Sequence, residues 1–323
     1  MSRMSYQRSP SGIALLLIAL STVFCTPAAA QIPGPGLDSY RAPPDRRWGP
    51  ITATDVEAAY VLLRDNHPGA APALHDTDFR ERLQSAHAAA KARAAQVTSY
   101  QGYLATLAAF AVAMGDKHIW SRPTFAVEMP RWPGFIVSKR GNLWVVTDAS
   151  GKQGALEGAH LLACNGKTVD ELARRSLGTF RVDWRIGAQQ LQSAPWLLVD
   201  EGNPFIERPE KCDFEHDGSH ETVQLQWQRI KRDTLAPKLK KAGGAGAAGF
   251  GLRRAGDGYW IALQDLASDD ATHVVEEVAA QKDQLRAAPF VVLDMRGNGG
   301  GSSLIGRDIA GDGQSLLQLL PAG

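Results

Sequence analysis

The sequence feature that most constrains the fold is a short apolar run followed directly by a cluster of glycines. Residues 290–293 read Phe-Val-Val-Leu, and residues 297–303 read Gly-Asn-Gly-Gly-Gly-Ser-Ser after an Asp-Met-Arg step. A continuous apolar run predicts a strand buried on both faces, and the glycines predict a turn with positive φ values. In such a turn the backbone approaches a ligand closely and can aim amide N–H groups at a developing negative charge, as an oxyanion hole does.

Residues 1–30 have the order of a secretory signal peptide. Arg3 and Arg8 precede an apolar stretch at residues 13–20, and three alanines at 28–30 supply the small residues of a cleavage site. The apolar stretch is too short to span a membrane. We therefore predict a periplasmic or secreted protein with no stable membrane anchor after cleavage.

The length and the charge of the chain limit the number of domains and the kind of partner that are expected. A chain of 323 residues is long enough for two or three domains. Without the two arginines of the signal peptide, 33 of the 35 basic side chains remain, against 34 acidic ones. This near-neutral balance gives no general attraction to nucleic acid, so no nucleic-acid partner is expected.

Residues 51–120 are predicted to form a helical bundle, preceded by an extended leader over residues 31–50. Thr54 and Glu57 predict a capping box at the start of the first helix, and Pro68 requires that helix to end before it. Apolar residues recur with helical spacing in three stretches, and short helices with facing apolar stripes make a bundle. The three helices are predicted over 54–66, 78–95 and 99–114.

A β-rich module is predicted over residues 130–176, followed by an unassigned connection over 177–221. Two strand-like runs are joined by a turn at 140–142, and Asn165-Gly166 predicts a second tight turn. The glycine-marked turn, the apolar pair Leu161-Leu162 and the Asn-Gly step resemble a PDZ domain in their order. PDZ domains bind extended peptide ends by adding them to a sheet edge, so the resemblance implies peptide C-termini as partners. An ordinary β-turn-β element is the alternative.

Residues 222–323 are predicted to contain an α/β core. Apolar residues alternate from Val223 to Trp227 as in a strand, and a glycine-alanine loop spans residues 242–251. The order strand, helix, strand predicts a parallel crossover connection. Those three elements are predicted over 259–263, 271–286 and 290–294.

The stretch from Asp294 to Gly301 resembles the Asp-Leu-Arg-Gly-Asn-x-Gly-Gly signature of the tail-specific (C-terminal processing) and tricorn-type serine peptidases. With the order of segments from Thr54 onward, the resemblance implies a multidomain α/β protein. Its parts are a helical bundle, a PDZ-like module and an incomplete ClpP/crotonase-like peptidase core. It implies hydrolysis of peptide bonds in exported proteins or peptides without a metal or organic cofactor. It also implies that the amides of Gly299 and Gly300 form the oxyanion hole.

The same resemblance raises a difficulty about the nucleophile. In the family, the catalytic serine lies on a later strand, and only residues 302–323 follow the signature here. We therefore expect the segment with the nucleophile to be missing and the chain to lack peptidase activity. Ser302 and Ser303 are more typical of helix N-caps than of nucleophiles. An inactive peptide-binding protein and a nonfunctional fragment are the alternative interpretations.

Gly115-Asp116-Lys117-His118 gives a second chemical signal. It resembles the Asp-x-His element that tricorn-type members place beside the active site, where the histidine is the general base. A neutral imidazole can accept a hydroxyl proton near neutral pH, which makes His118 the candidate base. Two alternatives stay open. The histidine is an exposed loop residue, or the chain descends from the serine–lysine branch and His118 has only a structural role.

The cysteines and nearby histidines allow other chemistry. Cys164 and Cys212 could pair in an oxidising compartment, but the apolar run around Cys164 favours a buried free thiol. Cys212, His216 and His220 have spacings that could suit zinc, with Glu215 and Glu221 nearby. The lone cysteine and the Asp-Gly turn between the histidines favour a polar loop, so no metal site is predicted.

Overall fold

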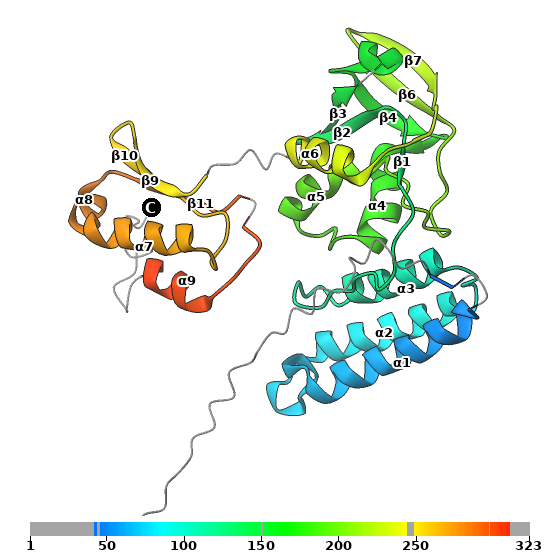
Figure 1. Cartoon of the computed structure of the whole chain (residues 1–323), viewed down its shortest axis with the longest axis horizontal. Helices are drawn as coiled ribbons and strands as arrows, with labels where there is room; N and C mark the ends of the chain where they lie inside the picture. The colour runs from blue at the N-terminus through cyan, green and yellow to red at the C-terminus, as the bar shows by residue number, and fades with distance from the viewer. Residues whose placement is uncertain (1–41, 44–45, 150, 244–248, 297, 311–323) are drawn as a thin grey trace, which may run out of the picture.

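The protein contains mixed helices and sheets in three groups of elements (Figure 1). The predicted signal peptide at 1–30 and most of the leader lie outside the described residues. The prediction of an extended leader up to residue 50 is wrong at its end, because Trp48 already begins the first helix. The computed structural model describes residues 42–43, 46–149, 151–243, 249–296 and 298–310.

The first group is the predicted helical bundle of three helices packed side by side, with two short 3₁₀ turns (Figure 1). The predicted capping box is wrong, because Thr54 lies inside the first helix and its hydroxyl donates to the Pro50 carbonyl. The end at Asn66 is confirmed, and Asp76 and Ser99 cap the next two helices. The elements are α1 (Trp48–Asn66), η2 (Pro68–Ala70), η3 (Pro72–Leu74), α2 (Thr77–Ala94) and α3 (Tyr100–Ala113).

The second group is an antiparallel sheet with strand order β2-β3-β4-β6-β7, on which β5 pairs with β4. Both predicted turns are confirmed: Gly141 joins β2 to β3, and Asn165 and Gly166 take positive φ between β4 and β5. The strands are β2 (Phe135–Arg140), β3 (Leu143–Ala149), β4 (His160–Cys164), β5 (Lys167–Thr168), β6 (Lys211–His216) and β7 (Ser219–Gln224).

Helices and a small second sheet accompany this antiparallel sheet. α4 begins at the N-cap Thr168 and contributes Val169, Ala173 and Leu177 to a core that also contains Trp144 and Phe214. The other elements are β1 (Arg131–Trp132), η4 (Gly151–Leu156), α4 (Val169–Phe180), α5 (Gly187–Ser193), η5 (Ala194–Trp196), β8 (Gln228–Arg229) and α6 (Arg232–Ala242); β1 pairs with β8.

Two predictions about this second group are wrong. The predicted core begins at Thr222, but Thr222 and Val223 lie in β7 and pair with β6. Cys164 is not a free thiol: it forms a disulfide with Cys212. β4 and β6 are antiparallel neighbours that set these two cysteines directly opposite each other, with a Cα–Cα distance of 4.0 Å.

The third group is a small α/β unit with strand order β11-β10-β9. β10 and β11 are parallel, as the strand-helix-strand order predicts. The helix between them is two helices rather than one, because Gln281 leaves helical geometry. The elements are β9 (Gly251–Ala255), β10 (Gly258–Ala262), α7 (Asp269–Ala280), α8 (Lys282–Ala287), β11 (Val291–Asp294) and α9 (Ser303–Ala310).

β11 is less buried than its apolar sequence predicts. Within the described residues it pairs only with β10, so it forms one edge of the sheet. Leu293 is 48% exposed, while Asp294 at its end is buried.

Figure 1 shows this third group set apart from the bundle and the antiparallel sheet. Among the described helices, none is both long and apolar enough to cross a membrane.

Candidate active site

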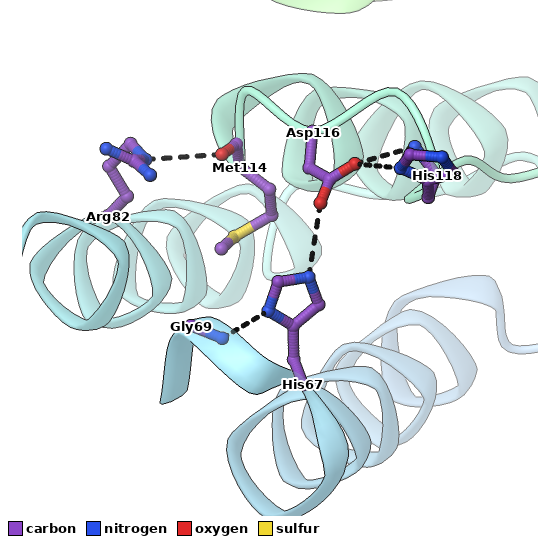
Figure 2. A network of polar contacts seen from close by, with 6 residues as sticks. All are labelled: His67, Gly69, Arg82, Met114, Asp116 and His118. Carbon is purple, nitrogen blue, oxygen red and sulfur yellow. Dashed lines mark hydrogen bonds and ion pairs between the residues drawn. The ribbon is translucent and has the colours of Figure 1, made fainter. Parts of the chain in front are cut away.

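The predicted base lies in the loop that follows α3. Gly115 turns the chain there with a φ of +67°, and Asp116 comes next. Figure 2 shows the Asp116 carboxylate between two histidine rings, His118 from its own loop and His67 from the end of α1. The bond from Arg82 Nε to the Met114 carbonyl, 3.2 Å long, ties the end of α3 to α2.

One ring nitrogen of His118 is hydrogen-bonded, and the other is open to solvent. Its backbone N–H and its ring Nδ1 both contact Asp116 Oδ1 at 2.8 Å. Because an ionised carboxylate only accepts hydrogen bonds, Nδ1 carries the proton and Nε2 of the neutral ring has a free lone pair. The side chain is 95% exposed, so Nε2 faces solvent. This arrangement suits a general base that takes a proton from an arriving hydroxyl.

His67 is a member of this site that the sequence did not reveal. Its Nδ1 accepts the Gly69 N–H at 3.1 Å, so the neutral ring carries its proton on Nε2. Nε2 then donates to Asp116 Oδ2 at 3.2 Å. The ring stacks on Phe79 with centroids 4.1 Å apart. His67 therefore fixes the second oxygen of the carboxylate that orients His118.

The bonds around Asp116 keep its carboxyl ionised. The backbone N–H of His118 has the largest effect in lowering the Asp116 pKa, and burial opposes it. The side chains of His118 and His67 lower the pKa further. An ionised Asp116 stabilises the positive charge that His118 acquires when it takes a proton.

The predicted oxyanion loop follows β11, and one of its two predicted donors is already engaged. Gly300 donates its N–H to Asn298 Oδ1 at 2.8 Å, and Asn298 is fixed in turn by a bond from its Nδ2 to the Leu263 carbonyl. Gly299 has no hydrogen-bond partner for its N–H within the described chain. Gly300 and Gly301 have φ values of +99° and +144°, as the glycine cluster predicts.

The Asp-x-Arg part of the signature has a structural role at the start of this loop. Arg296 folds back and donates from Nε and Nη2 to the two oxygens of Asp294, at 2.9 and 2.7 Å. Trp260 on β10 donates its indole N–H to the same carboxylate at 3.2 Å. The Arg296 bond is the main reason that the Asp294 pKa falls to about 2. The buried carboxylate thus anchors the first turn of the loop.

The structure does not bring the two predicted parts of the site together. His118 has Asp116 as its side-chain partner and is otherwise exposed, while the glycine loop belongs to the third group. No serine of the described residues is hydrogen-bonded to the His118 ring. Ser302 accepts the Leu304 N–H at 3.2 Å, which is the capping role expected of it.

Two of the candidate zinc ligands, Cys212 and Glu215, are engaged in other contacts. Cys212 is bonded to Cys164 and is not available as a thiolate. Glu215 contacts His160 at 3.0 Å and accepts the Gly218 N–H. Across the described residues, no group of three or more histidine, cysteine, aspartate or glutamate side chains is arranged to hold a metal ion.

Comparison with known proteins gives a likeness of fold. No protein-family model matches the chain, and no curated protein matches it. Among the solved structures that it resembles are structures of CPAF. CPAF in complex with lactacystin matches with a TM-score of 0.50 at 14% identity, over 80% of this chain and 58% of the CPAF chain. A serine-to-alanine mutant of CPAF matches with a TM-score of 0.54 at 13% identity, over 79% of this chain and 57% of that chain.

The chain therefore spans less than two thirds of the length of the CPAF chains that it matches. At this identity the similarity is one of fold alone, a fold of mixed helices and sheets like that of CPAF.

Proposed function

We propose that this protein is a serine-type peptidase of the tail-specific and tricorn type in its fold and in its general base, His118, and that it is inactive unless a nucleophile is supplied from outside the described residues. The observation that carries the proposal is the contact between Asp116 and His118 Nδ1, which leaves Nε2 open to a substrate hydroxyl or a nucleophile. The protease-like fold supports it. The substrates are peptide bonds of exported proteins or peptides.

The proposed chemistry assigns each group one role. His118 Nε2 takes the proton of an attacking serine, and the ionised Asp116 stabilises the imidazolium that forms. The Gly299 N–H is the donor for the oxyanion only in an arrangement that brings the glycine loop to His118, and it is chosen because the Gly300 N–H is held by Asn298. No serine hydroxyl of the described residues is hydrogen-bonded to His118, so the proposal takes the nucleophile from outside them.

The disulfide supports the proposal of an exported protein. Disulfides form and persist in the periplasm and outside the cell, and Cys164–Cys212 joins two buried strand positions. We propose that the mature chain begins at Gln31. N-terminal sequencing of periplasmic material tests this, and Met1 on the purified protein would contradict it.

A fluorophosphonate probe and an unfolded protein substrate test the peptidase proposal. We expect no turnover and no stoichiometric labelling of the 323-residue chain, because no described serine lies against His118. Lactacystin provides a second reagent, since CPAF has been solved in complex with it. Labelling that is lost in Ser302→Ala would contradict the assignment, because it would place the nucleophile in the glycine loop.

A non-catalytic peptide-binding protein is the second candidate, and one observation favours it. β7 is the outer strand of the antiparallel sheet among the described residues, and its residues 219–222 are exposed. An exposed strand edge can accept an extended peptide as a further strand. Amide resonances of β7 that shift on adding a peptide with a free C-terminus, while those around His118 do not, would favour this candidate.

A further inference from the structure

A cavity of about 570 Å³ lies between the helical bundle and the antiparallel-sheet group. One wall is the apolar face of α3, where Leu104, Ala105 and Ala108 line it. α4 contributes Leu177 and Phe180 to the opposite wall. A cavity of this size holds a small organic molecule or the end of a peptide.

Two arginines at the polar end of this cavity share a single carboxylate. Arg232 Nη1 contacts Glu201 Oε1 at 2.9 Å, and Arg181 Nη2 contacts Glu201 Oε2. The Arg181 guanidinium lies 3.8 Å from the centre of the Trp196 ring, which also lines the cavity. Two positive charges therefore face one negative charge.

One buried N–H group of these arginines lacks an acceptor within the described residues. Arg232 Nε is buried and has no hydrogen-bond partner in the described chain. Arg181 donates to Glu201 through Nη2, and its side chain is 33% exposed. Burial lowers the pKa of Arg181, and Glu201 opposes that effect. Burying an unpartnered donor of a charged group is unfavourable, so an anion that accepts the Arg232 Nε–H would stabilise the site.

None of the other acids around the cavity is hydrogen-bonded to Arg181 or Arg232, and three of them pair with other cations. Asp200 binds Arg208 at 2.7 Å, and Asp183 binds Arg185 at 2.7 Å. Glu207 contacts Lys167 at 3.4 Å. Asp116 keeps its negative charge between the neutral rings of His67 and His118, and the cationic Lys117 and Arg122 also line the cavity. One unit of positive charge therefore remains at the Arg181–Glu201–Arg232 cluster.

We propose that this cavity binds a carboxylic acid with an apolar body, whose carboxylate rests against Arg181 and Arg232. A planar carboxylate matches the fork of N–H donors that a guanidinium presents, and a monoanion balances the one excess charge. The α3 wall and Trp196 cover the apolar body. The proposal does not depend on the peptidase function, because it uses neither His118 nor the glycine loop.

Matched acid and amide probes test the proposal. N-acetyl-leucine and N-acetyl-phenylalanine are titrated against the purified chain by calorimetry, each beside its carboxamide, together with a tripeptide acid ending in phenylalanine. We expect the acids to bind and each carboxamide to bind at least tenfold more weakly. Tighter binding of the tripeptide than of N-acetyl-phenylalanine assigns the site to peptide ends, and equal or weaker binding assigns it to small acids. If no acid binds, or if acids and carboxamides bind alike, the proposal is wrong.

Three variants localise the binding. Arg181→Met should weaken acid binding at least tenfold, while Arg175→Met, an exposed arginine on α4 that pairs with Glu171, should leave it unchanged. Glu201→Gln should tighten acid binding, because it removes the carboxylate that competes for both arginines. A gain of affinity cannot come from unfolding. Equal acid affinity in wild type, Arg181→Met and Glu201→Gln would overturn the assignment.

Discussion

Asp116 holds His118 through one carboxylate oxygen, since Oδ1 accepts both the backbone N–H and the ring Nδ1–H of His118 at 2.8 Å. The two bonds fix the tautomer and orientation of a side chain that is otherwise open to solvent. An exposed loop histidine without a partner would sample several rotamers and both tautomers. The pair therefore favours a chemical role for His118 over that of a plain surface residue.

We predict that His67→Ala loosens this pair. The variant removes the donor to Asp116 Oδ2 and the stack on Phe79, and should cost about 1–2 kcal/mol of stability. The population of the His118 tautomer with the proton on Nδ1 should fall. The ¹⁵N chemical shifts of the ring nitrogens measure that population. His273→Ala, an exposed histidine on α7, is the control. An unchanged His118 tautomer would show that Asp116 is positioned without His67.

Reducing the disulfide should destabilise the antiparallel sheet. The bond joins residues 48 positions apart in buried strands, and removing such a link costs about 2–4 kcal/mol. Urea unfolding of the protein with and without reductant measures the change, and the double variant Cys164→Ala, Cys212→Ala should match the reduced protein. Two free thiols in the protein as purified under non-reducing conditions would contradict the prediction.

The glycine cluster offers a matched pair of substitutions. A Cβ on Gly301 would lie 2.3 Å from the backbone of Leu266, at a φ of +144°. Gly301→Ala should therefore destabilise the third group by about 1–3 kcal/mol. A Cβ on Gly299 meets no atom within 4 Å, so Gly299→Ala should be nearly neutral. Amide hydrogen exchange in β10 and β11 measures the loss of stability in each variant. Equal losses in Gly301→Ala and Gly299→Ala would contradict the close approach of the loop to Leu266.

Asp294 should make the third group sensitive to acid. Its folded pKa is about 2, below the ordinary 3.8, so its contribution is present above about pH 4 and is lost as the pH falls towards 2. Asp294→Asn should cost about 2 kcal/mol at pH 7 and progressively less below pH 4. Urea titrations followed by β10 and β11 resonances measure this, with Asp257→Asn in the β9–β10 turn as control. A stability difference between wild type and Asp294→Asn that does not change with pH would refute the low pKa of Asp294.

Local chemistry explains what the sequence predicts about this fold. Pro68 ends α1 at Asn66, Ser99 begins α3, and the Asn165-Gly166 step turns β4 into β5. Each of these features depends on a few neighbouring residues. The parallel pairing of β10 with β11 follows because a helix-containing connection joins two apolar strands.

Contacts between distant residues explain what the sequence does not predict. The disulfide requires β4 and β6 to be neighbours, and the order of the sheet cannot be seen in either strand alone. In the candidate site, Asp116 and His118 are two positions apart and form a motif. His67 reaches Asp116 across 49 positions, and its sequence context shows only a helix end before proline. The Gly300 bond to Asn298 depends on loop geometry that a glycine count cannot give.

The rate at which the protein accelerates hydrolysis of p-nitrophenyl acetate near neutral pH tests the central claim most directly. An imidazole whose Nε2 is open and whose proton is held by Asp116 should react faster than the other histidines of the chain. We predict that His118→Ala removes most of this rate, that Asp116→Asn lowers it, and that His273→Ala leaves it unchanged. Equal rates in wild type, His118→Ala and His273→Ala would contradict the assignment of His118 as an oriented base.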